Sequence, residues 1–309
     1  MPKILKKRDL PKFLNKLIKK GYEVIAPIKT DTSKFSIIKD PNQIYLEKLP
    51  EYPVKNFFFP QKEVLFEFKN NKIIERIKPK KRIIFGIRKC DINGLLRLDH
   101  LFSSEKQYKT QRENTILIGL NCKNPDEYCF CESMDLKENY DLFFYEDKNN
   151  YYISIGSKKG LELVKNLKNL KKQFKEEIRC KKYLEKKDYE RFYYNPGWQE
   201  LANKCLSCAA CTILCPTCAC FDVNDEFNLD LKSGKRTRQY ASCQLKSFTK
   251  IAGNKVFRES RLDRYKHFVY HKILYFRQDF HENLCVGCGR CIRHCPKRID
   301  WVELINKPK

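Results

Sequence analysis

In its last third the sequence reads Cys205-Leu-Ser-Cys208-Ala-Ala-Cys211-Thr-Ile-Leu-Cys215-Pro216, and 80 positions later it reads Cys285-Val-Gly-Cys288-Gly-Arg-Cys291-Ile-Arg-His-Cys295-Pro296. Both stretches have the spacing C-x2-C-x2-C-x3-C-P, which is the ferredoxin-type arrangement of ligands for two 4Fe-4S clusters. Three thiolates on one tight loop reach three irons of a cube, while the fourth cysteine faces away from them and reaches the other cube. The spacing therefore predicts one cluster on Cys205, Cys208, Cys211 and Cys295, and a second on Cys285, Cys288, Cys291 and Cys215.

Zinc is the alternative for these two runs, because paired C-x-x-C motifs also build zinc ribbons. A zinc site needs two pairs of ligands, and it leaves no role for the third cysteine or for the proline after the fourth. The cluster interpretation uses every cysteine of both runs. In the second run, Gly287 and Gly289 let the backbone bend close to the sulfur atoms, where its N–H groups can hydrogen-bond the cluster and tune its potential.

The composition fits a cytoplasmic protein that uses its cysteines for metal or redox chemistry. The 309 residues include 16 cysteines, and 42% are hydrophobic, which is enough for a real core in about two domains. No stretch approaches the roughly 18 apolar residues of a membrane span, and the first residues lack the apolar run of a signal peptide. In a reducing cytoplasm so many thiols are not expected to form a disulfide framework.

The net charge of +25 has two interpretations. Dense Lys and Arg would suit nucleic acid, because they neutralise phosphates. Lys, Ile, Asn and Tyr are all plentiful along the chain, however, which indicates a general bias in residue usage rather than one basic face. An acidic protein partner is the better expectation, since a field of this sign would steer it.

The N-terminal half has the pattern of an α/β (or α+β) domain. Apolar residues at helical spacing predict an amphipathic helix over 10–18, which we expect to pack on the core rather than on a membrane surface. The apolar runs 82–88 and 115–121 flank a helical segment over 91–102, which indicates a βαβ unit with buried strands. Alternating residues predict hairpins over 63–77 and 140–155, and a charged helix is expected over 161–178.

The composition changes near Arg191, where cysteines become frequent and apolar strand-like runs thin out. We therefore predict an α/β domain over 1–190 and a two-cluster domain over 191–309. About 70 residues separate the two cysteine runs, and parts of that connection look helical. The second domain is accordingly expected to be a mainly helical ferredoxin-like dicluster domain.

Eight cysteines lie outside the two runs, and four of them suggest a third metal centre. Cys90 follows the first buried strand, Cys122 follows the second, and Cys129 and Cys131 come shortly after it. If the strands are parallel neighbours, their carboxyl ends lie side by side, where α/β sheets place their sites. We predict a third 4Fe-4S cluster on these four residues; zinc on the same residues and free thiols are the alternatives.

The remaining four cysteines have no assigned ligand role. Cys218, Cys220 and Cys243 are close in sequence to the first run or to its following segment, so they are expected to pack near the first cluster rather than bind it. Cys180 lies in a lysine-rich segment and is expected to have no metal role.

Several segments together resemble one family, the β (iron-sulfur) subunit of sulfhydrogenase-type soluble hydrogenases and the similar iron-sulfur component of anaerobic sulfite reductase. The resemblance spans nearly the whole chain. Its segments are Phe59-Pro-Gln-Lys-Glu-Val-Leu-Phe66, Gly86-Ile-Arg-Lys-Cys-Asp91, Asn121-Cys to Cys129-Phe-Cys131 with Ser133-Met134, Cys215-Pro-Thr-Cys-Ala-Cys220, and the final cysteine run. The chain departs from the family pattern at Asp-Leu-Lys-Glu after Met134, at Ala219, and at Tyr240-Ala-Ser-Cys243, which lacks the usual Trp-Asp.

The resemblance implies a non-catalytic subunit that carries electrons. In such complexes a flavin subunit, which binds FAD and handles NAD(P)H, exchanges electrons through the iron-sulfur subunit with a NiFe hydrogenase or sulfite reductase subunit. The sequence agrees in having no G-x-G-x-x-G after a strand and no Walker loop, so no nucleotide site of its own is visible. A nucleic-acid-binding protein with structural clusters is the alternative function.

Overall fold

The computed structural model describes residues 1–70, 72–75, 79–171 and 174–307, and these group into two compact units. Unit 1 comprises Met1–Phe58, Lys78–Asp126 and Asp135–Cys180; unit 2 comprises Phe59–Ile77, Glu127–Met134 and Lys181–Lys309. Relative to the predicted division into 1–190 and 191–309, two earlier segments join the C-terminal unit, and its continuous part begins at Lys181 rather than at residue 191. Among the described residues, none of the helices has the length and apolar character needed to span a membrane.

Within its described residues, unit 1 is built on an eight-stranded mixed sheet in the order β10-β1-β9-β8-β7-β6-β2-β3. The four strands β2, β6, β7 and β8 run parallel, and the flanking strands are antiparallel. The strands are β1 (Lys3–Lys6), β2 (Glu23–Lys29), β3 (Ser33–Ile37), β6 (Arg82–Ile87), β7 (Thr115–Leu120), β8 (Leu142–Glu146), β9 (Asn150–Ile155) and β10 (Lys168–Asn169). The helices are α1 (Leu10–Lys19), α2 (Lys89–Leu101), α3 (Lys106–Glu113) and α4 (Lys158–Val164).

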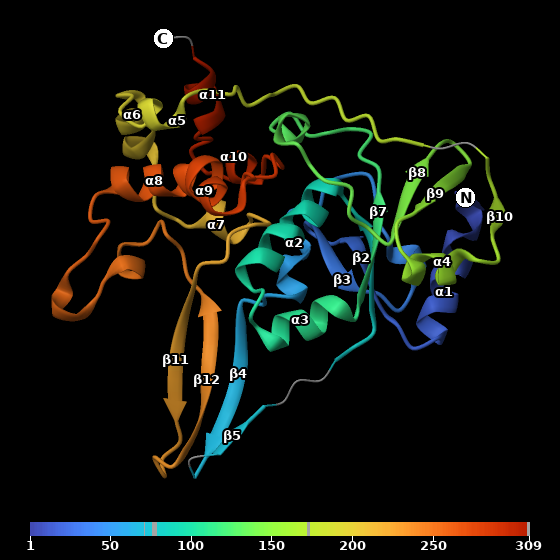
Figure 1. Cartoon of the computed structure of the whole chain (residues 1–309), viewed down its shortest axis with the longest axis horizontal. Helices are drawn as coiled ribbons and strands as arrows, with labels where there is room; N and C mark the ends of the chain where they lie inside the picture. The colour runs from blue at the N-terminus through green and yellow to red at the C-terminus, as the bar shows by residue number, and fades with distance from the viewer. Residues whose placement is uncertain (71, 76–78, 172–173, 308–309) are drawn as a thin grey trace. The chain divides into compact units, whose positions relative to one another are not determined.

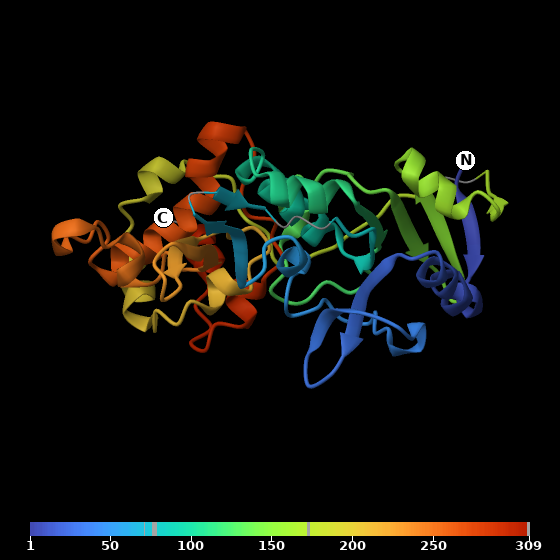
Figure 2. The ribbon, with the colours of Figure 1, turned by 90° about the horizontal axis from the view of Figure 1, so that it is seen from below.

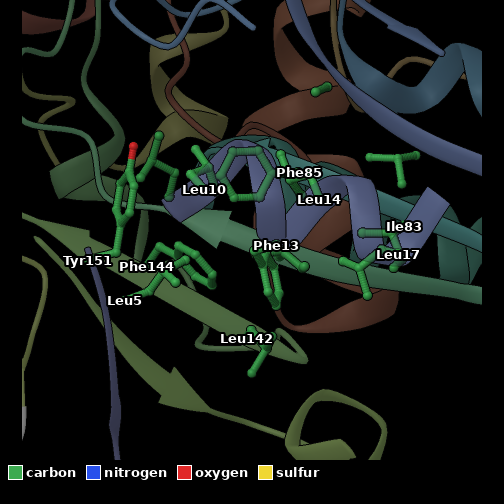
Figure 3. Close-up of a cluster of buried hydrophobic side chains, with 14 of the residues drawn as sticks. Leu5, Leu10, Phe13, Leu14, Leu17, Ile83, Phe85, Leu142, Phe144 and Tyr151 are labelled. Atoms are coloured by element: carbon green, nitrogen blue, oxygen red, sulfur yellow. The ribbon is translucent and has the colours of Figure 1, made fainter. Parts of the chain in front are cut away.

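The predicted βαβ unit is confirmed, because β6 and β7 are neighbouring parallel strands connected through α2 and α3. The amphipathic helix α1 also forms as expected. Its Leu10, Leu14 and Leu17 join the buried cluster that covers one face of the sheet, and Phe13 lies 6.3 Å from Phe144 between ring centroids. Figure 3 shows these side chains converging from α1 and from the strands.

The prediction of a helix over 161–178 is wrong beyond Val164. Helix α4 ends at Val164, and the amide of Leu167 turns back to the carbonyl of Val164. The chain then adds β10 to the edge of the sheet, where Asn169 pairs with Lys3. The physical reason is that the edge strand β1 offers unpaired backbone groups, whereas the charged run has too few apolar residues to bury a longer helix. Positions 172 and 173 lie outside the described residues.

Unit 2 combines short helices with a four-stranded antiparallel sheet in the order β11-β12-β4-β5. The expectation of a mainly helical domain is therefore not confirmed for the described part of this unit. Its strands are β4 (Lys62–Lys69), β5 (Lys72–Ile74), β11 (Phe221–Phe227) and β12 (Ser233–Tyr240). Its α-helices are α5 (Tyr189–Phe192), α6 (Gly197–Lys204), α7 (Ala210–Ile213), α8 (Arg261–Tyr270), α9 (Phe276–Phe280), α10 (Arg290–Arg293) and α11 (Trp301–Asn306).

The helices of unit 2 gather around the two cysteine runs, away from the tip of the β11–β12 hairpin (Figure 1, Figure 2). Helices α8 and α9 are joined by a π-helical turn over His271–Tyr275. Where β12 meets β4, Arg238 donates from Nε to Glu63 Oε1 over 2.9 Å, and both side chains are buried. This ion pair fixes the hairpin to the earlier segment Phe59–Ile77.

Candidate iron-sulfur centres

The two cysteine runs adopt the same local backbone. In each, the third cysteine lies in a one-turn helix, α7 or α10, and the preceding residues are left-handed. The φ angles are 52° at Ser207 and 65° at Ala209, against 66° and 70° at the equivalent Gly287 and Gly289. The amides of Ser207 and Gly287 each point at the first sulfur of their run, 3.4 Å from Sγ of Cys205 and Cys285. Each run thus forms a loop with amide donors aimed at its own sulfur atoms.

The ligands predicted for the first cluster share one cavity. It contains about 460 Å³ of empty space, part of it open to solvent, and is lined by both cysteine runs together with Tyr265, Phe268 and Trp301. The cysteines on its wall are Cys205, Cys208, Cys211 and Cys295, with Cys291 also present. Cys295 of the second run therefore lies in the same cavity as the three cysteines of the first run, and its role as the fourth ligand stays a prediction.

The ligands predicted for the second cluster are buried together. Burial, with smaller contributions from the neighbouring Cys288 and Cys215, raises the pKa of the Cys285 thiol to about 12, although Lys272 and the amide of Gly287 act to lower it. Burial also raises the pKa of Cys291, again with contributions from Cys285, Cys288 and Cys215, while the indole N–H of Trp301 lowers it. Apart from this approach to Cys291, the buried Nε1 of Trp301 has no hydrogen-bond partner in the described part of the chain. Buried thiols and a buried N–H donor beside one of them fit a cluster, whose irons stabilise thiolates and whose sulfurs accept N–H donors.

A single aromatic residue lies beside both ligand sets. Tyr265 on α8 is buried, which raises its pKa well above the ordinary value. The cysteines that add to this shift include Cys211 of the first set and Cys291 of the second. Cysteines of both ligand sets therefore lie near the same side chain.

Lys272 is a functional candidate that sequence reasoning missed. It lies in the π-helical turn, is 2% exposed, and donates from Nζ to Sγ of Cys215 and Sγ of Cys218, each over 3.1 Å. Burial by itself would lower its pKa, but Cys215, Cys218 and Cys285 hold the pKa well above its ordinary range. One lysine among many in a basic chain gives no sequence signal, and only the turn of the helix brings it to the sulfurs.

Cys218, Cys220 and Cys243 lie close to the ligands, as expected from the sequence. Cys218 shares a hydrogen bond with the thiol of Cys215, and Cys243 shares one with the thiol of Cys220; these contacts raise the pKa of Cys218 and of Cys243. The amide of Ala241 bonds to the carbonyl of Cys220 over 2.9 Å, which aligns the ends of β11 and β12. Their packing beside the ligands, rather than metal binding, stays the prediction for these three thiols.

The structure places the predicted third-cluster ligands in different units. In unit 1, Cys90 begins α2 after β6, and Cys122 follows β7, at the carboxyl ends of adjacent parallel strands. The guanidinium of Arg88 links these ends by donating to the carbonyls of Leu120 and Asn121. Burial raises the pKa of Cys122, and the thiol of Cys180 contributes, which places Cys180 near it as well.

In unit 2, Cys129 and Cys131 belong to a segment that packs on the second cysteine run. The amide of Phe130 donates to the carbonyl of Gly287 over 2.8 Å, and Cys129 Sγ lies 3.6 Å from the carbonyl oxygen of Cys288. Within the described residues, no three His, Cys, Asp or Glu side chains are placed to hold one metal ion. The third cluster and its zinc alternative therefore stay predictions.

Comparison with known proteins agrees with this geometry. A family model described as a 4Fe-4S dicluster domain matches residues 204–299, which contain both cysteine runs. The sulfhydrogenase 2 subunit beta of Pyrococcus furiosus is 32% identical over 324 aligned residues, which cover 96% of this chain and 95% of the relative. The chain belongs to the family of sulfhydrogenase beta subunits. The match to the dicluster domain indicates two 4Fe-4S clusters within residues 204–299. No solved structure matches the chain.

Proposed function

We propose that this beta-subunit relative is the electron-transfer subunit of a soluble anaerobic complex. It relays electrons between a subunit that binds FAD and oxidises or reduces NAD(P)H and a catalytic subunit of the NiFe hydrogenase or sulfite reductase type. The observation that carries the proposal is that Cys295 lies in one cavity with the first cysteine run and Cys215 lies near Cys291 of the second, inside one compact unit, which supports an exchange of fourth ligands. Ligands exchanged in this way would hold two clusters as neighbours in one unit, as electron transfer between them requires.

In this mechanism the clusters supply one-electron chemistry, and the chain sets where the electrons reside. Potentials depend on net charge, on burial and on hydrogen bonds to sulfur. The two sites differ in these respects: Cys208 of the first set is exposed, whereas Cys285 and Cys288 of the second set are buried. Amides of Ser207 and Gly287 supply comparable donors to each. Because solvation affects the reduction potential, the two clusters are expected to have different potentials.

A third cluster on Cys90, Cys122, Cys129 and Cys131 is part of the proposal. The adjacent carboxyl ends of β6 and β7 support the pairing of Cys90 with Cys122, and the packing of 127–134 on the second run supports a position near that cluster for Cys129 and Cys131. Free thiols and zinc remain the competing assignments. Three clusters correspond to about twelve irons per chain, and two to about eight.

The decisive experiment is an anaerobic purification of the chain from its native host together with whatever copurifies. We expect a flavin protein to copurify with a hydrogenase or sulfite reductase protein, with cluster signals that titrate between about −700 and 0 mV. The excess of 25 positive charges supports acidic partner surfaces. Isolation without partners, tight DNA binding with a steep salt dependence, and clusters that do not titrate would instead favour the nucleic-acid alternative.

A further inference from the structure

One buried lysine distinguishes the second cluster site from the first. Lys272 Nζ has two sulfur partners and a hydroxyl, since it lies 3.1 Å from Sγ of Cys215 and of Cys218 and 3.4 Å from Oγ1 of Thr217. On another side it approaches the ring of Phe268, 5.2 Å from the centroid. An ammonium group this deeply buried is costly unless a negative charge compensates it. The compensating charge must come from the sulfurs.

The backbone of Lys272 is tied to the same site. Its carbonyl accepts a hydrogen bond of 3.1 Å from the amide of Cys285, the first cysteine of the second run. Both ends of the residue therefore contact the proposed ligand set, through Cys285 at the backbone and Cys215 at the side chain. The π-helical turn over His271–Tyr275 adds a residue to the helical path, and such insertions are frequent at functional sites.

We propose that Lys272 sets the reduction potential of the cluster held by Cys215, Cys285, Cys288 and Cys291. A cluster with four thiolate ligands is negatively charged, and its charge becomes more negative by one unit when it takes up an electron. A fixed positive charge beside one ligand stabilises the reduced state more than the oxidised state. Lys272 thereby raises the potential of the second cluster above the value that the same buried site would have without the charge. This inference rests on the proposed two-cluster assignment.

The test is a redox titration of the full chain, followed by electron paramagnetic resonance under anaerobic conditions. Lys272→Met removes the charge and keeps most of the side-chain volume. At a fixed ambient potential we expect the ratio of reduced to oxidised second cluster to fall about tenfold, which corresponds to ~59 mV for one electron. The potential of the first cluster should change less, because Lys272 hydrogen-bonds no ligand of that set and acts on Cys211 only through the field of its charge.

Two matched variants separate charge from packing. Lys272→Arg keeps the charge and should stay close to wild type. Lys266→Met removes a positive charge from α8, where Lys266 lies over the ring of Tyr193, and should leave both potentials unchanged. The proposal is overturned if Lys272→Met keeps its full iron content and both cluster potentials stay unchanged. It is also overturned if Lys266→Met shifts the potentials of both clusters equally.

Iron analysis of each variant keeps the outcomes distinct. If Lys272→Met loses one cluster and Lys272→Arg retains it, the positive charge is needed to hold the reduced site, which supports the proposal. If both variants lose the cluster, Lys272 serves packing and the proposal is wrong. If the wild-type chain itself holds fewer than about eight irons, the two-cluster assignment fails before the role of Lys272 is tested.

Discussion

Replacing Gly287 with alanine should destabilise unit 2 and impair loading of the second cluster. The backbone at Gly287 has a φ of 66°, where a residue with a side chain costs about 1–2 kcal/mol. A Cβ atom there would lie 2.5 Å from the amide nitrogen of Cys131, so the 127–134 segment must shift. Overpacking a tight site costs about 1–3 kcal/mol. The free energy of unfolding should therefore fall by about 2–5 kcal/mol in total.

Two variants provide matched controls for this prediction. Gly21 has a φ of 84° and no atom within 4 Å of an added Cβ, so Gly21→Ala carries only the backbone cost of about 1–2 kcal/mol. Ser207 occupies the equivalent position of the first run and already has a side chain at a φ of 52°. Ser207→Ala should therefore leave the first cluster loaded.

The assay is anaerobic thermal unfolding combined with iron analysis. Gly287→Ala should lower the unfolding midpoint more than Gly21→Ala does, and it should reduce the iron content by about four atoms per chain, the number in one cluster. The reasoning is refuted if Gly287→Ala and Gly21→Ala have the same midpoint and both keep full iron. That result would mean that the contact with Cys131 places no constraint on the loop.

Three other perturbations have defined outcomes. Arg238→Met removes the guanidinium that pairs with the buried carboxylate of Glu63, and it should lower the free energy of unfolding by about 3–5 kcal/mol. The double variant with Glu63→Gln should restore much of that loss, and an equal loss in the single and double variants would contradict this. Cys122→Ser should lower the iron content from about twelve to about eight per chain if the third cluster exists, whereas unchanged iron would exclude Cys122 as a ligand. Burial lowers the pKa of His267 and of His271 to about 4, so only the unfolded chain takes up protons as the pH falls below about 6.5, and stability should drop between pH 6.5 and 4. The variant with both histidines changed to Gln should show a shallower fall, and an identical pH profile would show that other groups cause it.

The sequence pattern predicted those helices and strands whose formation depends on the apolar periodicity of their own residues. The helix α1 and the parallel pair β6 and β7 were visible because apolar periodicity over several turns or strands depends on burial of one face. The strand β10 after Val164 could not be predicted in this way, because it forms by pairing with the free edge of β1, which lies far away in sequence. Likewise, the four-stranded sheet in unit 2 joins β4 to β12 across more than 160 positions, which no local pattern reveals.

The candidate site shows the same division. Cysteine spacing predicted the first ligand set, and the four cysteines lie on one cavity wall. Spacing gave no sign of Lys272, Tyr265 or Trp301, because each is an ordinary residue in an amphipathic or terminal helix. These residues acquire a role only when their helices close around the two cysteine loops.

By itself, the sequence predicted the cluster chemistry of this protein, since three of the four ligands of each cube come from one short cysteine run, whose spacing is a short-range constraint, and the fourth comes from the end of the other run. Only the tertiary structure decided the surroundings of the clusters. The π-helical turn brings a buried positive charge to Cys215, and the segment 127–134 closes on Gly287 and Gly289. Long-range electrostatics and close packing depend on which distant residues meet in space, and the order of residues along the chain does not specify that locally.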